Sequence, residues 1–239
     1  MKIIRDILDS IRQDAPVQEL LVGVHWTAVL TRGCGMASTV MSAKPHGEGA
    51  IRAAGDLQRL SALELAAYAL SDNTLEASIG LAALNSLMDF PEKNVVEVNA
   101  FDFLAKQGAG KIVAVFGHFP NTTTLKQAAS RVIIFELTPS EGEHGLDEVP
   151  RLLPSADLVA ITSNSLINHT LADILPHIRA GAFSMLLGPS TPLSPVLFDH
   201  GLDMLAGVRV TDTRLCFNSI AQGAIFRQVK GVELVTITR

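Results

Sequence analysis

The first residues of the chain alternate apolar and polar positions with the period of a helix. Over residues 2–13 one face is apolar and the other charged, which predicts an amphipathic helix; the apolar face consists of Ile3, Ile4, Ile7, Leu8 and Ile11. Residues 20–31 and 34–41 are then mainly apolar stretches typical of strands. The turn-forming segment Thr31-Arg32-Gly33 separates them, so we expect a hairpin.

Two helices are expected next, after a loop. Residues 42–55 combine Pro45 and His46 with several glycines, which predicts a loop whose backbone can approach a ligand closely. Ser61 and Glu64 have the spacing of a capping box and predict a helix that continues to about residue 70. The second helix should cover about residues 73–88, where a stripe of small residues permits close packing.

From Lys111 onward the pattern changes to alternating strands and helices. Apolar runs at 111–116, 131–137, 157–162, 183–188 and about 203–208 predict parallel strands, with helices on both faces of the sheet. Residues 231–238 predict a last strand. The fold class is therefore α/β, and we expect two domains, an α+β domain at residues 1–108 and a parallel-sheet domain at 109–239.

The segment around Gly117 indicates a binding site. Residues 111–116 are a short run rich in β-branched residues, Gly117 ends it, and Pro120 opens a predicted helix. Such a loop directs backbone N–H groups and a helix dipole at one point, which suits an anion such as phosphate. Dinucleotide-binding loops have three glycines, whereas this loop has Gly117 alone. We expect this strand to be central in the sheet.

Other strand ends carry short polar residues as well. Ligands of open α/β sheets bind beyond the carboxyl ends of the strands, and Glu136 lies 19 positions after Gly117, a distance typical of an acid that contacts a ribose. Each of these residues also has an ordinary interpretation as a strand end or a helix cap. Their coincidence at one edge favours a site; the candidate ligand-binding residues are Gly117, Phe119, Pro120, Asn121, Thr122, Glu136, Thr162, Ser163, Asn164, Gly188, Pro189, Ser190 and Thr191.

His118 is the candidate catalytic residue among seven histidines. Its position in the Gly117 loop suits a general acid or base, a metal ligand or a donor to an anion, and equally a histidine that only packs the loop. No HExxH spacing indicates a preformed zinc site. In the first domain, His46 and Asn85 are candidates, and we predict that one of them faces residues 117–120 across an interdomain groove. The alternative places His46 in solvent and Asn85 in a helix–helix contact.

Composition narrows the class of protein. Of 239 residues, 48% are hydrophobic and 18% charged, which excludes a disordered chain. A net charge of −5 without a basic run argues against a nucleic-acid partner, and no apolar run reaches the roughly 18 residues of a membrane helix. Asp6 near the start argues against a signal peptide, and two distant cysteines favour a reduced, cytoplasmic protein. A homodimer is the default assembly.

Several motifs resemble known families. The segments Gly33–Thr39, Glu64–Ala66 and Gly80–Asn85 resemble the DUF4213 family, and Gly117–Pro120 with Gly188–Pro192 resembles the DUF364 family, which is named for heavy-metal chelation. The resemblance implies an enolase-N-terminal-like domain, a Rossmann-like domain and a ligand site between them. The expected function is binding of a small anionic, nucleotide-like or metal-associated ligand there; the alternative is an enzyme that uses His118 as acid or base. The sequence identifies no metal or cofactor.

Overall fold

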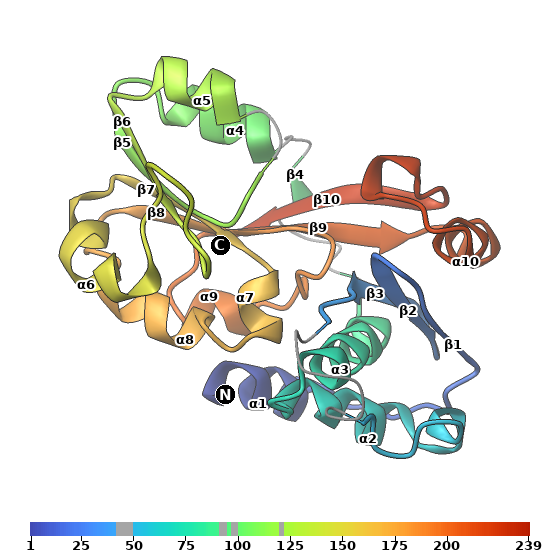
Figure 1. Cartoon of the computed structure of the whole chain (residues 1–239). Coiled ribbons are helices and arrows are strands. Elements are labelled where there is room, and N and C mark those ends of the chain that lie inside the picture. The colour runs from blue at the N-terminus through green and yellow to red at the C-terminus, as the bar shows by residue number, and fades with distance from the viewer. Residues whose placement is uncertain (42–49, 91–94, 97–99, 120–121) are drawn as a thin grey trace.

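The computed structural model describes residues 1–41, 50–90, 95–96, 100–119 and 122–239. It has a mixed α/β fold with one three-stranded and one seven-stranded sheet (Figure 1). Helix α1 (Lys2–Ser10) buries Ile3, Ile4 and Ile7, which confirms the predicted amphipathic helix, although the helix ends three residues earlier than expected. No helix in the described part of the chain is long and apolar enough to span a membrane.

The smaller sheet is antiparallel and contains β1 (Glu19–Val22), β2 (Trp26–Leu30) and β3 (Cys34–Ser38) in that order. The β2–β3 hairpin, with Leu30 opposite Cys34, confirms the predicted turn. The prediction of one strand over residues 20–31 is wrong, because Gly23 to His25 separate β1 from β2. Gly23 is crowded at this point, since a Cβ there would lie 2.6 Å from Cγ2 of Ile220.

Helix α3 (Thr74–Leu87) covers this sheet and helix α2 (Ala62–Ala66) packs against α3, with short 3₁₀ turns at Leu57–Arg59 and Ala67–Leu70. The capping box of Ser61 and Glu64 is present, and Asn73 caps α3. Gly35 of β3 lets the strand come close to α3, because a Cβ added there would lie only 2.2 Å from the carbonyl oxygen of Ala82. The backbones of the helix and the strand are therefore in direct contact.

The larger sheet has the strand order β4-β10-β9-β8-β7-β5-β6. Five neighbouring strands, β6, β5, β7, β8 and β9, are parallel as predicted, whereas β10 and β4 are antiparallel to their neighbours. The strand bounds are β4 Val95–Val96, β5 Ile112–Phe116, β6 Arg131–Phe135, β7 Leu158–Thr162, β8 Phe183–Leu187, β9 Met204–Val210 and β10 Val232–Thr238.

Strand β5 is an internal strand, but it lies second from the β6 edge and β8 is the middle strand, so the expectation that β5 is central is wrong. The chain runs from β5 to β6 on one side and then to β7 on the other side. The strand order therefore reverses between β5 and β7, and the loops that follow these two strands border the point where open α/β sheets bind ligands.

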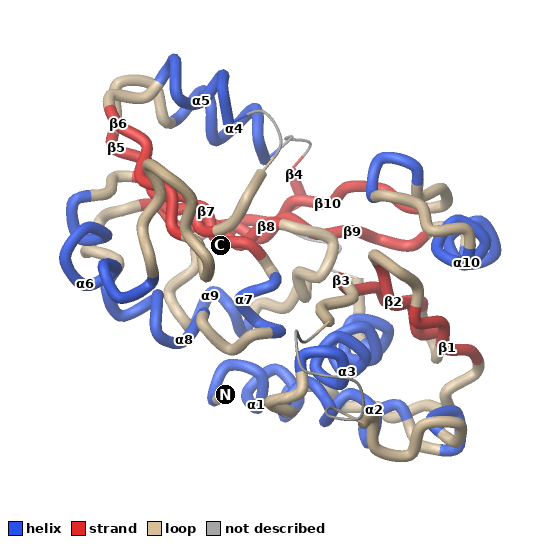
Figure 2. Tube along the Cα trace, in the orientation of Figure 1, coloured by secondary structure: helices blue, strands red, loops and turns tan. Residues whose placement is uncertain are grey.

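Short helices cover the faces of this sheet (Figures 1 and 2). Helices α4 and α5 contact each other on one face, and α6, α7, α8 and α9 lie on the other. The helices are α4 Ala100–Gln107, α5 Thr122–Ala128, α6 Val149–Leu152, α7 Asn164–Ile167, α8 Leu171–Ile174, α9 Val196–Asp199 and α10 Thr213–Ala221, with 3₁₀ turns at Leu146–Glu148, Leu153–Ser155, Leu175–His177 and Phe226–Gln228.

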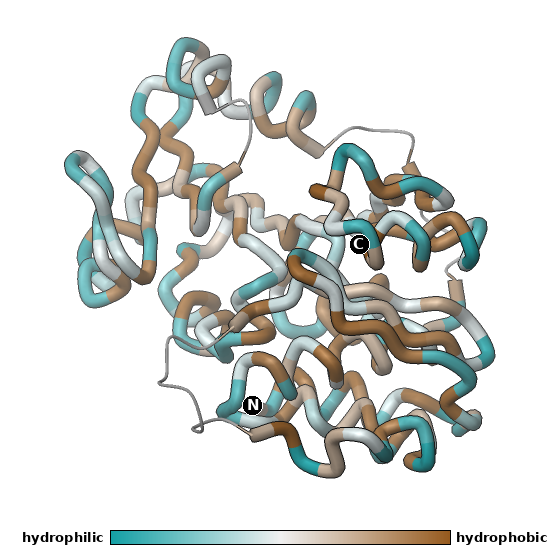
Figure 3. The backbone as a smooth tube through the Cα atoms, turned by 45° about the vertical axis from the view of Figure 1, so that its right-hand side comes forward, coloured by the Kyte–Doolittle hydropathy of each residue, from teal (hydrophilic) through white to brown (hydrophobic). Residues whose placement is uncertain are grey.

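A continuous hydrophobic core joins the two sheets. It includes Leu65 and Leu84 from the first part of the chain and Ile161 and Leu205 from the second, all buried. Hydrophobic residues follow the strands and the inward sides of the helices, and hydrophilic residues occupy the outer loops (Figure 3). Residues 95–96 and α4 pack with the larger sheet, although they precede the boundary expected near residue 108.

Candidate functional site

Two adjoining pockets lie beyond the carboxyl ends of the parallel strands. We call the first the aromatic pocket, with a volume of about 300 Å³, and the second the polar pocket, with about 350 Å³. His118, Thr162 and Asn164 line both of them. The two pockets therefore adjoin at these residues, and together they are called the groove below. Each has a volume near the lower end of the range of small-molecule sites.

The aromatic pocket is enclosed by rings from both parts of the chain. Trp26 of β2 meets Phe226 edge-on with ring centroids 5.5 Å apart, and Phe101 of α4 meets Phe119 at the same distance. The indole Nε1 of Trp26 is buried and finds no hydrogen-bond acceptor among the described residues. Because a buried N–H without an acceptor is costly, this group is a donor available to a ligand.

Two carboxylates of the segment that follows β6 lie close to His118, and one of them, Glu136, lines the polar pocket. The Nδ1 atom of His118 contacts Oε1 of Glu136, and its Nε2 lies 2.9 Å from Oε1 of Glu143. The Glu136 oxygen is buried and has no aligned hydrogen bond with any described residue. A hydrogen bond from the Ser140 N–H, helped by His118, lowers the pKa of Glu143. His118 itself is 71% exposed, so it is accessible at the junction of the pockets.

The charged side chains that line the groove or contact His118 are carboxylates. Neither pocket is lined by a lysine or arginine among the described residues. Glu136 lines the polar pocket, and Glu143 approaches it through His118. The lining thus gives no cationic support to the phosphate expected from the sequence, and it favours neutral, hydroxylated or cationic groups.

Glycines allow the strand-end loops to meet. Gly117 has φ +94° and Gly188 has φ +130°, conformations that other residues rarely adopt. A Cβ on Gly117 would lie 3.0 Å from Cγ2 of Thr162, and one on Gly188 would lie 2.5 Å from Oγ of Ser163. The loops after β5, β7 and β8 therefore pack together because two of them turn at glycine.

Most of the predicted site residues line the groove. These are Gly117, His118, Phe119, Glu136, Thr162, Ser163, Asn164, Gly188 and Pro189. His46, Pro120 and Asn121 lie outside the described residues, as does the side chain of Thr122, the first residue of α5. Ser190 is fully buried, and its Oγ accepts a hydrogen bond of 2.8 Å from the Ser38 N–H, so it joins β3 to the loop after β8.

Asn85 does not face the Gly117 loop, and because His46 lies outside the described residues, the expectation that one of these two side chains faces residues 117–120 stays a prediction. Its Nδ2 donates to the carbonyl oxygens of Met36 and Ser190, at 3.0 and 3.1 Å, and the side chain lines a different pocket together with Thr191. Asn85 does bridge the two parts of the chain, but it reaches the loop after β8 instead of the one after β5. The close packing of β3 against α3 at Gly35 brings the Met36 carbonyl oxygen within reach of the Asn85 side chain.

Sequence reasoning missed the aromatic wall and the contribution of the smaller sheet. Trp26, Ser38, Phe101 and Phe226 line the groove but come from segments distant in sequence from the strand ends. One signal was available, because Ser38 belongs to the Gly33–Thr39 motif. The rings carried no signal of their own, since isolated aromatic residues in strands and helices are usually part of a core.

Histidine and carboxylates are suitable metal ligands, but their arrangement does not make a metal site. The two ring nitrogens of His118 face different carboxylates on opposite edges of the ring. The described ranges contain no group of three or more His, Cys, Asp or Glu side chains that could hold a metal ion. Cys34 and Cys216 are free thiols, and the hydrogen bond between them raises the pKa of Cys34, which disfavours a reactive thiolate there.

Comparisons with known proteins agree with this fold. A crystal structure of a DUF364-family protein of unknown function from Desulfitobacterium hafniense has a TM-score of 0.82 and 30% identity, over 100% of this chain and 97% of that one. A second DUF364-family structure, from Pyrococcus horikoshii and also of unknown function, has a TM-score of 0.82 at 20% identity over 100% and 98% of the two chains, which shows the shared fold alone.

An uncharacterized protein of Methanocaldococcus jannaschii is 28% identical over 151 residues, which span 59% of this chain and 58% of that protein. The DUF364 family model matches residues 99–239 and the DUF4213 model matches residues 4–88, and both are described as "Putative heavy-metal chelation". With most of its length matched, the chain belongs to the DUF364 family and carries a DUF4213 segment at its N-terminal side.

Proposed function

We propose that the protein binds a small nucleoside-like molecule, with a flat ring and hydroxyl groups, in the groove. The observation that carries this proposal is the unpartnered indole N–H of Trp26, which needs an acceptor at the aromatic end of the groove. At the polar end, the Glu136 carboxylate contacts His118 and can accept further hydrogen bonds from a ligand. A heteroaromatic ring supplies the acceptor, and vicinal hydroxyls supply the donors.

The walls support the same class of ligand. A flat ring gains stacking and burial between Trp26, Phe101 and Phe119, while Thr162 and Asn164 offer hydrogen bonds where the pockets join. The absence of lysine and arginine from the described lining favours a nucleoside over a phosphorylated nucleotide. The proposed ligand is therefore nucleotide-like without being strongly anionic.

If the protein handles a heavy metal, we propose that the bound small molecule, and not a cluster of protein side chains, is the main chelator. The described residues hold no preformed cluster of metal-binding side chains, so we propose that any metal is carried as a complex, with His118 exposed to complete its coordination. The family description supports this reading of the groove as a metal-handling site. The metal ion would then be cargo that arrives with its chelator.

We also propose that the two parts of the chain are separate domains, enolase-N-terminal-like and Rossmann-like. The strand order around β5 and β7 supports the second label. Residues 95–96 and 100–107 pack with the larger sheet, which favours a boundary before β4 over the one expected near residue 108. In this arrangement the groove receives Trp26 and Ser38 from the first domain.

Calorimetric titration with adenosine tests the proposal. Adenosine should bind saturably, AMP should bind no more tightly, and Glu136→Gln should weaken adenosine by roughly tenfold through loss of a charge-assisted hydrogen bond. Glu19→Gln, which removes an exposed carboxylate that lines neither pocket, is the matched control and should leave the affinity unchanged. Tighter binding of AMP, or an unchanged affinity in Glu136→Gln, would contradict the proposal.

A second candidate function is an enzyme that uses His118 as acid or base. The observation in its favour is the position of His118 at the junction of the pockets, in contact with Glu136 and 2.9 Å from Glu143. A carboxylate that orients an exposed imidazole is a common arrangement for proton transfer. His118→Ala separates the two functions: loss of turnover with retained ligand affinity supports an enzyme, and loss of affinity alone supports a carrier.

A further inference from the structure

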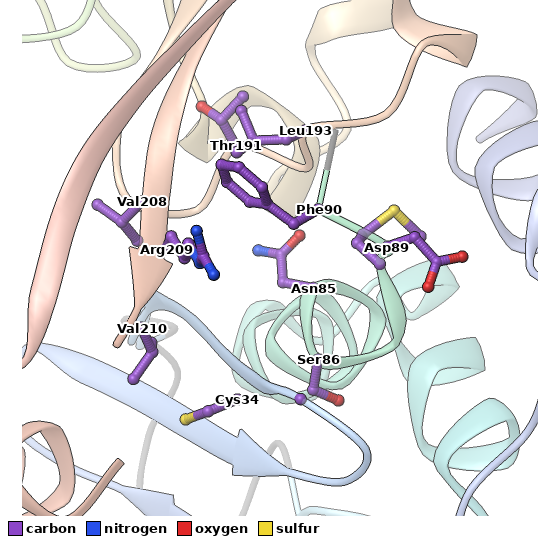
Figure 4. Close-up of a pocket in the computed structure, with 12 residues that line it drawn as sticks. Cys34, Asn85, Ser86, Asp89, Phe90, Thr191, Leu193, Val208, Arg209 and Val210 are labelled. Atoms are coloured by element: carbon purple, nitrogen blue, oxygen red, sulfur yellow. The ribbon is translucent and has the colours of Figure 1, made fainter. Parts of the chain in front are cut away.

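A third pocket lies between the two sheets, away from the groove, and we call it the Asn85 pocket. It has a volume of about 160 Å³ and is lined by α3, the start of β3, the loop after β8 and strand β9. Figure 4 shows Asn85, Phe90 and Arg209 around its centre, with Thr191 and Leu193 on one side. The volume is roughly that of a protein cavity that holds a benzene-sized molecule.

The amide of Asn85 is held in one orientation. Its Nδ2 donates both hydrogens, to the carbonyl oxygens of Met36 and Ser190. A flipped amide would place an oxygen against these two carbonyls, so the network assigns Oδ1 to the pocket side. This Oδ1 is buried and accepts no hydrogen bond from any described residue. Oδ1 of Asn85 is therefore a strong hydrogen-bond acceptor with a fixed orientation and no donor among the described residues.

Two further groups have complementary chemistry. The hydroxyl of Thr191, a residue only 3% exposed, is also buried and unpartnered within the described ranges. The guanidinium of Arg209 lies over the Phe90 ring at 4.4 Å and reaches Glu233 through one nitrogen at 3.5 Å. Several of its five N–H donors are therefore available to a carboxylate. The remaining wall has an apolar side formed by Leu193, Val208 and Val210. It also includes Ser86 and Asp89, whose carboxylate is paired with Arg32 at 2.6 Å.

From this arrangement we propose that the Asn85 pocket binds a small aliphatic α-amino acid. The ammonium group donates to Oδ1 of Asn85, the carboxylate pairs with Arg209 and accepts from Thr191, and the aliphatic side chain lies against the apolar wall. A neutral alcohol would satisfy Asn85 but leave Arg209 unused, and a simple carboxylate would leave Asn85 unsatisfied. The zwitterion serves all three polar groups.

Titration calorimetry with three matched probes tests the site. L-Valine carries both charges, 3-methylbutanoate lacks the ammonium group, and isobutylamine lacks the carboxylate. Valine should bind saturably, and each analogue should bind at least roughly tenfold more weakly, as expected for the loss of one charge-assisted hydrogen bond. Either analogue binding as tightly as valine would overturn the proposal, as would no saturable binding of valine, in which case the pocket holds only water.

Variants locate the binding to this pocket. Arg209→Gln and Thr191→Val should each weaken valine binding, the first by roughly tenfold or more. Arg59→Gln is the matched control, because it removes an arginine that is 83% exposed and pairs with Asp56 on the surface. Thermal unfolding of each variant confirms folding before titration. An unchanged valine affinity in folded Arg209→Gln would overturn the assignment of the carboxylate, and therefore the proposal.

Discussion

The groove and the Asn85 pocket lie between the same two parts of the chain, yet they have opposite chemistry. The groove combines aromatic rings with carboxylates and a histidine. The Asn85 pocket combines an amide oxygen and an arginine with aliphatic side chains, and the one carboxylate of its described lining, Asp89, is paired with Arg32. The loop after β8 contributes to both, with Gly188 and Pro189 on the groove and Thr191 on the other pocket.

The difference follows from where each site stands relative to the sheet. The groove lies beyond the carboxyl ends of parallel strands, where loops can carry polar residues without disturbing the core. The Asn85 pocket lies beside the close contact of α3 with β3, where the polar atoms are held by neighbouring backbone carbonyls. One site is built by loops, and the other by packing, so substitutions should affect them differently.

Gly35→Ala should have the largest effect, because it acts on both sites. A Cβ at this position would lie 2.2 Å from the Ala82 carbonyl oxygen, so α3 and β3 must separate. We expect a loss of roughly 3 kcal/mol or more in the free energy of unfolding, measured by urea denaturation. Gly110→Ala is the comparison, since φ is +70° there but no atom of the described residues lies within 4 Å of the added Cβ. Equal losses in the two variants would contradict the packing argument.

Trp26→Leu should separate the two sites. Removal of the ring takes away stacking and the indole donor, so adenosine affinity should fall by roughly 10–100-fold. Valine affinity should stay within a factor of two or so, because Trp26 does not line the Asn85 pocket. Calorimetry with both probes on the same folded sample measures the contrast, and parallel losses would mean that the sites are not independent.

Thr191→Val should change stability only slightly, and in the favourable direction. The variant keeps the shape of a side chain that is 3% exposed and removes a buried hydroxyl without a partner in the described structure. The free energy of unfolding should rise by up to about 1 kcal/mol in ligand-free protein. A decrease of that size, measured by thermal unfolding, would show that the hydroxyl has a structural partner.

The smallest of the expected effects is that of acid on the groove. Protonation of Glu143 should weaken its contact with His118, whereas the Asn85 amide does not titrate. The Ser140 N–H, with burial opposing it and His118 assisting, lowers the pKa of Glu143 in the folded state. A carboxyl with a depressed pKa stabilises the fold above its unfolded pKa, and this contribution is lost as pH falls through the folded value. NMR titration of the Glu143 carboxyl should show a pKa below that of an unfolded peptide, and an equal value would contradict the contact.

Local signals in the sequence predicted most of the elements. The period of the apolar residues located α1, the spacing of Ser61 and Glu64 located α2, and the apolar runs located the parallel strands. The break at Gly23 escaped notice because residues 20–31 remain mainly apolar across it. The antiparallel direction of β10 depends on long-range pairing with β9, which no local pattern encodes.

The sequence predicted only those groove residues that follow the carboxyl ends of the parallel strands. The strand-end rule located Gly117, Glu136, Thr162 and Gly188, because a parallel sheet fixes where its carboxyl ends meet. It could not supply Trp26 or correct the position of Asn85, since both depend on how the smaller sheet docks against the larger one. That docking is set by packing over the whole interface.

The fluorescence of Trp26 tests the central claim most directly. Trp26 is the single tryptophan of the chain, and it lines the aromatic pocket with its indole N–H unpartnered among the described residues. A ring that stacks in this pocket and accepts from the indole must change the emission. Titration with adenosine should therefore shift or quench the signal in a saturable way, whereas valine should leave it unchanged. Unaltered emission with adenosine at millimolar concentration would contradict the proposed use of the groove.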